Sequence, residues 1–324
     1  MDKKILVTPR SFGSGGPAAK NILDRENFQV VYNNTGRHYT EKEMIEKSKA
    51  AAGIIVGTDP VTKRVIEEAT NLEVISKYGV GLDNIDIAAA NDEGIMVTYT
   101  PGTNTEAVAE LSIGLALDLA RGISAVDKQV KKRQWEQKRG MELHGKLIGI
   151  IGTGRIGKRV AEIANCFKME VKCYDIDEKE EWANKIGAEY CSLKELIASS
   201  DIISLHVPLN SNTKDLINKK ELDIMKESSI LINTARGGII NEKELIKALK
   251  KDKIGGAGID VFTEQPPQHE KFYDLDNIIM TSHIASHTVE SINKMGIFAA
   301  QNLIKGLNGE VPEAVVNPEF TENC

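Results

Sequence analysis

Arg236 and His283 are the two residues whose types and positions most directly suggest chemistry. Each closely follows an apolar run that predicts a buried strand, so each is expected at the carboxyl edge of a sheet, where ligands bind in α/β folds. A guanidinium holds a carboxylate through two parallel hydrogen bonds, and an imidazole exchanges a proton near neutral pH. Together they would supply a cation that holds a carboxylate and a carbonyl oxygen and an acid/base that exchanges a hydroxyl proton.

Position alone leaves other interpretations open for both residues. Arg236 could cap a helix or lie on the surface, a lone histidine is usually structural, and His287 competes with His283. A third histidine and the two residues after it end another predicted strand and are expected to border a cofactor rather than react: His206, Val207 and Pro208.

The other histidines and the cysteines show no ligand-like grouping. The histidines are too scattered for a metal site, so none is predicted: His38, His144 and His269. The cysteines have neither C-x-x-C pairing nor zinc-site spacing, and we expect reduced thiols: Cys166, Cys173, Cys191 and Cys324.

A glycine-rich segment, Gly152–Gly157, ends one predicted strand and opens a helix with the spacing G-x-G-x-x-G. Gly152 and Gly154 allow a tight turn whose N–H groups can approach a pyrophosphate, and Gly157 allows close helix–strand contact. Arg155 and Ile156 lie between them, in the first turn of the helix. The segment predicts a dinucleotide site.

Asp175 ends the next predicted strand, where an acid would meet the adenosine ribose hydroxyls. With Asp177 and Glu178 close behind it, a 2′-phosphate would be repelled, so NAD is favoured over NADP. One alternative is a glycine-rich turn that binds nothing. Another is a methyltransferase, although the position of Gly157 at the helix start argues against that class.

Short Ile- and Val-rich runs alternate with helix-period segments, which predicts βαβ units around parallel sheets and an α/β fold class. The first series of predicted strands comprises Ile5–Thr8, Gln29–Tyr32, Gly53–Val56, Val74–Ser76 and Met96–Tyr99. The second comprises Leu147–Ile151, Val171–Tyr174, Ile202–His206, Ile230–Asn233, Gly256–Ile259 and Ile278–Met280. We therefore expect two Rossmann-like or flavodoxin-like lobes, each with a doubly wound parallel sheet.

Two long helices are predicted to cross between these lobes. The first runs from Asn104 to about Arg121, after the breaker Pro101-Gly102, and the second from Glu290 to Leu307. The second would carry the chain back to the first lobe. Two crossings would leave an interlobe cleft, a usual place for a small-molecule site.

Composition limits the classes of function. The 324 residues suggest two domains at roughly 150 residues each. A net charge of −6 disfavours nucleic acid and anionic lipid as partners. No stretch approaches the roughly 20 apolar residues that span a bilayer, and the start lacks a signal-peptide pattern, so a cytoplasmic protein is expected.

These motifs, in this order, resemble the D-isomer-specific 2-hydroxyacid dehydrogenase family, and most closely its D-3-phosphoglycerate dehydrogenase-like branch. The likeness covers nearly the whole chain. Besides Gly152–Gly157 and His283, it runs through the segments Lys77–Asp86, Thr100–Asn104 with Val108–Glu110, His206–Pro208, Asn233–Gly238 and Gly258–Phe262.

The resemblance implies a substrate-binding outer domain of residues 1–100 and 287–324 and an NAD-binding Rossmann domain of residues 101–286. It implies that Arg236 holds the substrate and that His283 is the acid/base. Further substrate-binding residues would be Lys77, Tyr78, Gly79, Val80, Gly81 and Asn104. Further cofactor-binding residues would be Thr234, Ala235, Asp260 and Ala285, with Arg236 and His283 also bordering NAD. The helix from Asn104 to Arg121 would help form a homodimer through the NAD-binding domain.

The sequence departs from the family pattern near the substrate. Gln265 precedes Pro266 where the family usually has Glu, so the histidine should protonate less readily and reduction should lose rate toward neutral pH. We assign Gln265 to the catalytic group as an orienter of His283. Lys77 stands where Arg is frequent, and Ala285-Ser286-His287 where Gly-Ala-Ser is frequent.

The sequence thus predicts an NAD-dependent oxidoreductase for a small D-2-hydroxy or 2-keto acid, with a phosphoglycerate-type substrate first. Glyoxylate or hydroxypyruvate reduction is the alternative within that class. A non-catalytic NAD(H)-sensing binding protein of the same fold is the alternative outside it.

Overall fold

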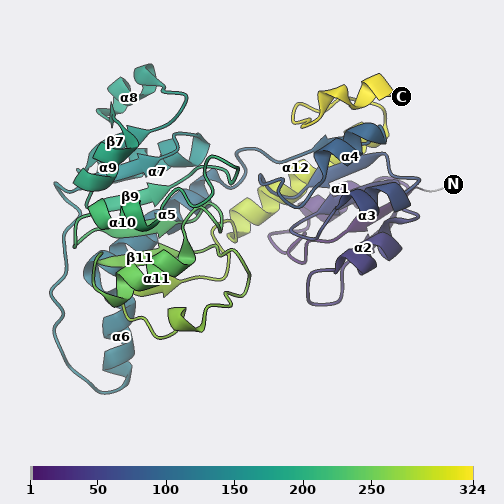
Figure 1. Ribbon diagram of the computed structural model, residues 1–324. Helices are drawn as coiled ribbons and strands as arrows, with labels where there is room; N and C mark the ends of the chain where they lie inside the picture. The colour runs from purple at the N-terminus through teal and green to yellow at the C-terminus, as the bar shows by residue number, and fades with distance from the viewer. Residues whose placement is uncertain (1–2, 324) are drawn as a thin grey trace. The chain divides into compact units, whose positions relative to one another are not determined.

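The computed structural model describes residues 3–323, and Cys324 lies outside them. The chain divides into two compact units (Figure 1). The first unit comprises Met1–Asn104 and His287–Cys324, and the second comprises Thr105–Ser286. The division into compact units falls after residue 104, and residues 287 onward return to the first unit.

The first unit is built on a parallel sheet. Its strands are β1 (Lys4–Val7), β2 (Gln29–Tyr32), β3 (Gly53–Val56), β4 (Val74–Lys77) and β5 (Met96–Thr98). Within the described residues they form one five-stranded sheet in the order β2-β1-β3-β4-β5. Strands β3 and β4 are buried at every position, as expected for parallel strands covered on both faces.

Helices cover both faces of this sheet. They are α1 (Ala18–Asp24), α2 (Glu41–Ser48), α3 (Lys63–Glu68), α4 (Ile87–Asp92) and α12 (Val289–Leu307), and η2 (Pro318–Asn323) is a 3-10 helix. Ile5 and Val7 pack with α1 and α12, whereas Leu6 packs with α2 and α3. Successive strand residues therefore serve two separate cores.

The second unit carries a larger parallel sheet. Its strands are β6 (Leu147–Ile151), β7 (Glu170–Tyr174), β8 (Glu189–Tyr190), β9 (Ile202–Leu205), β10 (Ile230–Asn233), β11 (Gly256–Ile259) and β12 (Ile278–Met280). Within the described residues their order is β12-β11-β10-β9-β6-β7-β8. The chain winds outward in both directions from β6, so the carboxyl ends of β6 and β9 mark the switch point where such folds bind ligands.

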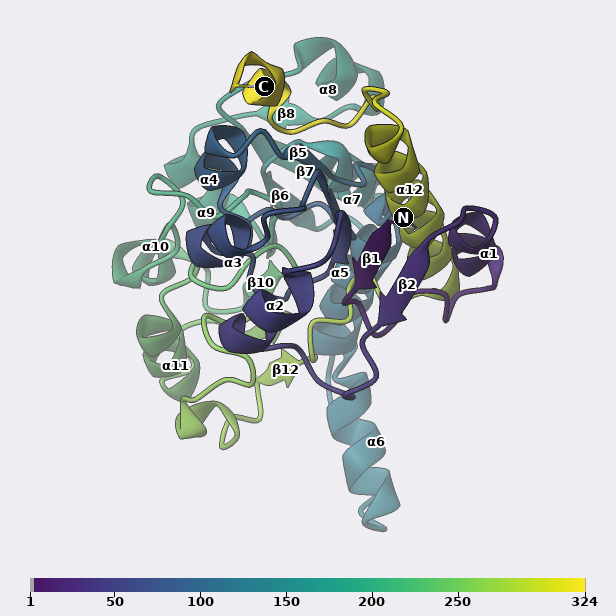
Figure 2. The same cartoon turned by 90° about the vertical axis from the view of Figure 1, so that its right-hand side faces the viewer.

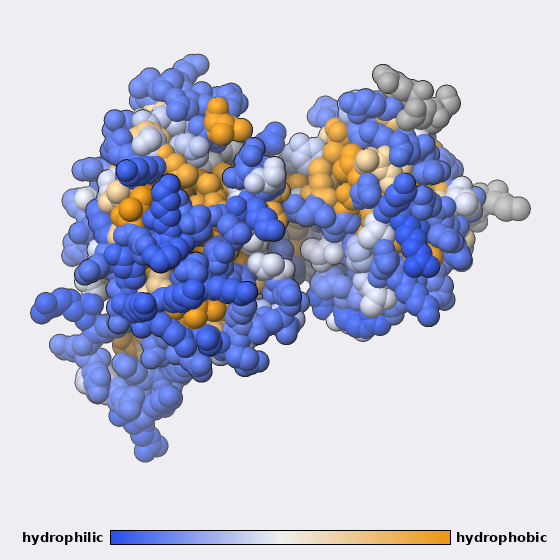
Figure 3. All heavy atoms as spheres, in the orientation of Figure 1, coloured by the Kyte–Doolittle hydropathy of each residue, from blue (hydrophilic) through white to orange (hydrophobic). Residues whose placement is uncertain are grey.

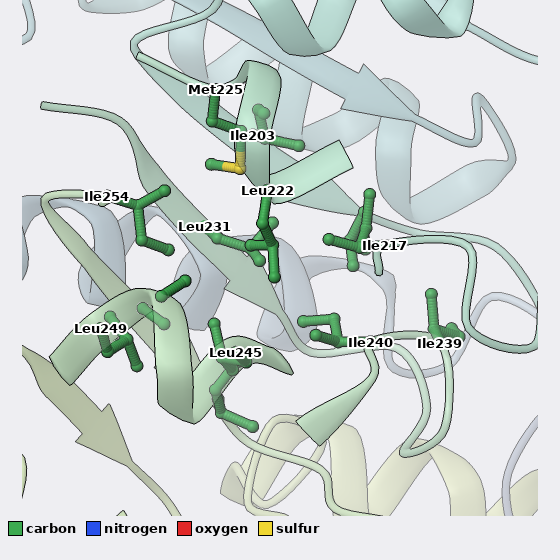
Figure 4. Close-up of a cluster of buried hydrophobic side chains, with 14 of the residues drawn as sticks. Ile203, Ile217, Leu222, Met225, Leu231, Ile239, Ile240, Leu245, Leu249 and Ile254 are labelled. Carbon is green, nitrogen blue, oxygen red and sulfur yellow. The ribbon is translucent and has the colours of Figure 1, made fainter. Parts of the chain in front are cut away.

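The helices of the second unit form a layer on each side. They are α5 (Thr105–Arg121), α6 (Ile123–Lys131), α7 (Arg155–Cys166), α8 (Glu180–Ile186), α9 (Leu193–Ser199), α10 (Lys219–Ile224), α11 (Glu242–Lys250) and the 3-10 helix η1 (Glu270–Phe272). One core lies beneath α5, α7 and α8. The other joins α10 and α11 to β9 and β10 (Figure 4).

The predicted strands are all present, with ends that differ by at most one residue. The α/β fold class with two parallel sheets is confirmed. Helix α5 is not a free connection between sheets, because it packs on β10, β11 and α7 as a layer of the second unit. Helix α6 extends from that unit and has no buried residue (Figures 1 and 2). Hydrophilic residues cover most of the visible surface of each unit (Figure 3).

Candidate active site

The glycine-rich turn between β6 and α7 is shaped by close backbone contacts. Gly152 has a φ of +96°, and a Cβ there would lie 2.6 Å from the His206 carbonyl oxygen. A Cβ on Gly157 would lie 1.9 Å from the Gly152 carbonyl oxygen. A Cβ on Gly154 would instead meet no heavy atom within 4 Å. Gly152 and Gly157 are therefore required by packing, whereas Gly154 faces open space.

Helix α7 begins directly behind this turn. Its N-cap is Gly154, which provides no side chain to accept from the first-turn N–H groups. Those N–H groups and the positive end of the helix dipole suit an anion. Arg155 is exposed and Ile156 is half-buried beside them. The turn, the open space at Gly154 and the uncapped helix start together fit the pyrophosphate of a dinucleotide.

Asp175, at the end of β7, is joined to the middle of this turn. Its Oδ2 accepts from the Thr153 amide at 2.5 Å and from the Thr153 hydroxyl at 3.0 Å. Its Oδ1 accepts from the Asp177 amide. Burial raises the pKa of Asp175, but the hydrogen bonds from Thr153 and Asp177 outweigh it and hold the pKa below its ordinary value. A negative charge thus lies beside the turn, as NAD selectivity over NADP requires.

His206 borders the same turn from the end of β9. Its amide donates to the Ile151 carbonyl at 2.7 Å, and its Nε2 lies 2.8 Å from the Ser204 hydroxyl. Burial lowers the pKa of His206 to about 3. A histidine with this pKa is neutral near pH 7, so it does not exchange a proton there. Val207 and Pro208 follow it in the same loop.

Arg236 lies on a rigid loop after β10. The Asn233 side chain closes this loop, because Oδ1 accepts from the Ala235 amide at 3.0 Å and Nδ2 donates to the Arg236 carbonyl at 2.9 Å. The Thr234 hydroxyl is 2.7 Å from the Ser112 hydroxyl of α5. At the next residue in the chain, a Cβ on Gly237 would lie 2.1 Å from the Phe262 carbonyl. The loop can shift little.

His283 lies on the loop after β12 and faces Gln265. Its Nδ1 is 3.0 Å from Gln265 Oε1, while Gln265 Nε2 donates to the Phe262 carbonyl at 3.4 Å. The second bond sets the amide so that oxygen faces the ring, which assigns the proton of the neutral imidazole to Nδ1. Nε2 then carries the lone pair. His283 has a φ of +57°, which few residues other than glycine adopt.

The loops of Arg236 and His283 belong to neighbouring strands. Strands β10, β11 and β12 are parallel and adjacent, so their carboxyl ends share one edge of the sheet with the glycine turn after β6. The Asp260 amide donates to the Asn233 carbonyl, and the His283 amide donates to the Asp260 carbonyl, each at 3.0 Å. Asp260 and Ala285 are buried in this region, whereas His287 is exposed and belongs to the first unit.

In the first unit, the side chains of Lys77 and Tyr78 serve internal contacts. Lys77 Nζ donates to the Gly57 carbonyl at 2.5 Å and to Asn84 Oδ1 at 2.6 Å, and the residue is only 4% exposed. The Tyr78 hydroxyl donates to the Ile292 carbonyl of α12, and burial raises its pKa. The lysine thus joins the loops after β3 and β4.

The next residues form an amide-lined loop. The Gly79 amide donates to the Thr100 hydroxyl at 3.0 Å, and the Gly79 carbonyl accepts from the Thr100 amide. Among residues 3–323, the amides of Val80 and Gly81 have no hydrogen-bond partner. Of the amides of Gly79, Val80 and Gly81, only that of Gly79 is bonded within the part of the chain that the structure describes. Asn104 is buried, at 8% exposure.

Several residues that hold the site were not predicted to have a role. Thr153, Ser112 and Asn233 hold the cofactor turn and the arginine loop, and Thr100 holds Gly79. Thr153, Asn233 and Thr100 lie inside the motif segments, which could have indicated them, whereas Ser112 lies within a helix outside those segments. Across residues 3–323, no group of three His, Cys, Asp or Glu side chains is arranged to hold a metal ion. No helix in that range is long and apolar enough to cross a membrane.

Comparisons with known proteins agree with this geometry. The family model described as D-isomer specific 2-hydroxyacid dehydrogenase, NAD binding domain, matches residues 113–285. Glyoxylate reductase of Pyrococcus furiosus is 38% identical over 329 residues, which cover 98% of this chain and 96% of that protein. D-3-phosphoglycerate dehydrogenase of Methanocaldococcus jannaschii is 42% identical over 86% of this chain, which spans only about half (54%) of that protein.

Solved structures extend the match to three dimensions. The TT0316 protein of Thermus thermophilus has a TM-score of 0.89 and 33% identity, with 97% of this chain and 99% of that chain covered. D-Lactate dehydrogenase of Aquifex aeolicus, solved with NAD and lactic acid, has a TM-score of 0.83 and 30% identity. The match covers 96% of this chain and 98% of that chain.

Proposed function

This chain belongs to the D-isomer specific 2-hydroxyacid dehydrogenase family, and we propose that it interconverts a small 2-keto acid and the D-2-hydroxy acid. The observation that carries this proposal is the placement of Arg236 and His283. Their loops follow β10 and β12, at the same edge of the sheet as the glycine turn after β6. The reduced cofactor, NADH, held at that turn, would supply the hydride for reduction, and the oxidised form, NAD⁺, would accept it in oxidation.

The two side chains have complementary tasks in this proposal. The Arg236 guanidinium holds the substrate carboxylate and carbonyl oxygen and stabilises negative charge on that oxygen. In reduction, His283 in its imidazolium form donates the Nε2 proton to the oxygen. In oxidation, the neutral ring accepts the hydroxyl proton at Nε2. Gln265 keeps the other nitrogen, Nδ1, protonated and thereby orients the ring.

We assign the remaining roles by unit. Residues 101–286 are proposed as the NAD-binding domain, and residues 1–100 with 287–324 as the substrate-binding domain. In the latter, the Val80 and Gly81 amides would donate to the substrate carboxylate. Thr234, Ala235, Asp260 and Ala285 are proposed to border the cofactor. Lys77 and Tyr78 are proposed to take part in substrate binding together with the loop that they anchor.

The substrate class has two candidates. The sequence favours a phosphoglycerate-type acid, which stays a prediction. The P. furiosus glyoxylate reductase matches along 96% of its own length, whereas the M. jannaschii phosphoglycerate dehydrogenase matches along 54%. The match along nearly the whole glyoxylate reductase supports the second candidate, which is reduction of glyoxylate or hydroxypyruvate.

A substrate panel tests these proposals. The purified protein is mixed with NADH and with glyoxylate, hydroxypyruvate, phosphohydroxypyruvate or pyruvate, and NADH absorbance is followed. We expect turnover with at least one acid and its loss in R236Q and H283Q. Tight NADH binding without any turnover would instead support the NAD(H)-sensing alternative.

We also propose a homodimer formed through the NAD-binding domain. Helix α6 and the segment after it expose three large apolar residues, Ile123 at 56%, Val130 at 41% and Trp135 at 86%, which a partner would cover. Sedimentation of the wild type and of W135S tests this, with a weaker dimer expected for the variant.

A cytoplasmic location is proposed because Cys166, Cys173 and Cys191 are unpaired, as is usual in reducing compartments.

A further inference from the structure

The hydroxyl of Tyr190 joins the edge strand β8 to the glycine-rich turn. It lies 2.8 Å from the Thr153 hydroxyl, and it accepts from the Lys179 amide at 3.1 Å. The ring itself is half-buried and packs against the core beneath α5, α7 and α8. One hydroxyl group therefore connects the turn after β6 with the segment that follows β7.

The direction of these hydrogen bonds follows from the groups involved. The Thr153 hydroxyl has one hydrogen, which it donates to Asp175 Oδ2 at 3.0 Å, because an ionised carboxylate can only accept. Tyr190 must therefore donate to Thr153, while its oxygen accepts from the Lys179 amide. The bonds run in series from the amide through the two hydroxyls to the carboxylate. Hydrogen bonds in series polarise and strengthen one another.

The series also determines which oxygen of Asp175 is used inside the protein. Oδ2 accepts from both the amide and the hydroxyl of Thr153, and a carboxylate oxygen has two lone pairs. Oδ1 accepts from the Asp177 amide at 3.1 Å. Because Thr153 occupies Oδ2, a ribose hydroxyl would have to bond with Oδ1, and the carboxylate must keep its present orientation to accept that bond.

Tyr190 further restrains the segment between Asp175 and α8. Lys179 is the N-cap of α8, and its ammonium lies 2.6 Å from Asp177 Oδ2. Residues 176–179 are all exposed, so packing restrains them little. Loss of the Tyr190 hydroxyl would free the Lys179 amide and the Thr153 oxygen together. The carboxylate of Asp175 would then lose support on both sides.

We propose that Tyr190 is a positioning residue for cofactor binding: through Thr153 it holds the Asp175 carboxylate in the orientation that accepts the 2′-hydroxyl of the adenosine ribose. This role rests on the proposed function, because it places the adenosine ribose of NAD at Asp175. Tyr190 acts without touching the cofactor, since Thr153 and Lys179 engage its hydroxyl. Its effect is on the affinity for NADH, whichever keto acid is reduced.

The variant Y190F tests this, because it removes the hydroxyl and keeps the ring. The Kd is measured by fluorescence titration for NADH and for the NADH analogue that lacks the 2′-hydroxyl of the adenosine ribose. In the wild type, the analogue should bind about tenfold more weakly than NADH, since the missing hydroxyl bonds to a charged group. In Y190F, NADH should bind about tenfold more weakly than in the wild type, whereas the Kd of the analogue should change by less than about threefold.

The ratio of the two Kd values separates positioning from a general structural role. A structural role alone would weaken NADH and the analogue equally. An unchanged ratio in Y190F would therefore overturn the proposal, as would an unchanged affinity for NADH. Y32F is the matched control, because the Tyr32 hydroxyl is buried and has no hydrogen-bond partner among residues 3–323. Both Kd values of Y32F should equal those of the wild type.

A second pair of variants carries the test if Y190F does not fold. T153V removes the hydroxyl between Tyr190 and Asp175, whereas T153S keeps it. We expect weaker NADH binding and a lower ratio of the two Kd values in T153V, and recovery of both in T153S. Equal binding by these two variants would overturn the proposal.

These measurements need no turnover, so they stay separate from the test of the proposed reaction. Absence of turnover with every keto acid would refute that reaction and leave the role of Tyr190 intact. Absence of NADH binding by the wild type would refute the cofactor site and, with it, the role of Tyr190.

Discussion

Gln265 Oε1 lies 3.0 Å from His283 Nδ1, so a neutral amide occupies the position from which a carboxylate would charge the imidazole. The amide fixes the tautomer as a carboxylate would, but it adds no full charge. Orientation and charge stabilisation, which a Glu would provide together, are thus separated in this protein.

The variant Q265E should restore the charge. A carboxylate beside the ring stabilises imidazolium, which is the form that donates the proton in reduction. The alkaline limb of the reduction profile should therefore move upward by about one pH unit. Rates of keto acid reduction measured across pH for both proteins check this, and coincident profiles would contradict it. Q265M keeps the size of the side chain but has only a weakly accepting sulfur, so it should lose rate at all pH values.

Two glycine variants should separate binding from folding. G154A adds a methyl group in open space where a pyrophosphate would lie, so NADH affinity should fall by at least about tenfold while the Tm stays unchanged. G157A forces a methyl group against the Gly152 carbonyl, so the free energy of unfolding should fall by about 3 kcal/mol or more. NADH titration and urea unfolding of both variants measure this. Equal effects of the two on stability would refute the distinction.

The variant K77M should affect the keto acid and leave NADH binding unchanged. It removes the ammonium that donates to the Gly57 carbonyl and to Asn84 Oδ1. The Gly57 carbonyl keeps its bond from Asn84 Nδ2, but Asn84 Oδ1 loses this donor, at a cost of about 1–3 kcal/mol. The loop bearing the Val80 and Gly81 amides loosens, so the KM for the keto acid should rise. K3M, which removes an exposed ion pair with Glu73, is the control and should cost below about 1 kcal/mol. A weaker NADH affinity in K77M would contradict this account.

His206 should make the folded protein less stable in acid. Its pKa is about 3 when folded against 6.5 when unfolded, so below pH 6.5 the unfolded chain binds a proton that the folded chain does not. Stability then falls as the pH drops from about 6.5 toward 3, with a slope of up to about 1.4 kcal/mol per pH unit. H206Q should lack this component. Urea unfolding of both proteins between about pH 7 and 4 measures how the free energy of unfolding depends on pH. The same pH dependence in H206Q and the wild type would contradict this prediction.

The regular part of the fold was predictable because both parallel sheets are covered on two faces. Their strands are continuous apolar runs, such as Ile230–Asn233, which stand out in the sequence. Strand β8 was missed because it has two residues and a polar composition. Helix α6 was missed because it has no buried face to impose a pattern.

The placement of candidate site residues was predictable where a residue type follows a strand, as with Arg236, His283 and the glycine turn. The hydrogen bonds that these residues make within the protein were not predictable, because such bonds depend on contacts between distant segments. Lys77 carries a charge and lies near a predicted ligand loop, yet its ammonium is directed to Gly57 and Asn84. Gly79 has an amide like its neighbours, yet Thr100 already accepts from it.

The hydrogen bonds between Thr153 and Asp175 matter for any attempt to change the cofactor preference of the protein from NAD to NADP. Substituting Asp175 would remove the repelling charge and, at the same time, the acceptor for the Thr153 amide and hydroxyl. Replacing Asp175 alone would therefore loosen the glycine-rich turn, which would hold the pyrophosphate of NAD and of NADP alike. D175N, which retains an acceptor oxygen, is thus a better starting point for engineering than D175A, and a basic residue for the extra phosphate would have to come from another position.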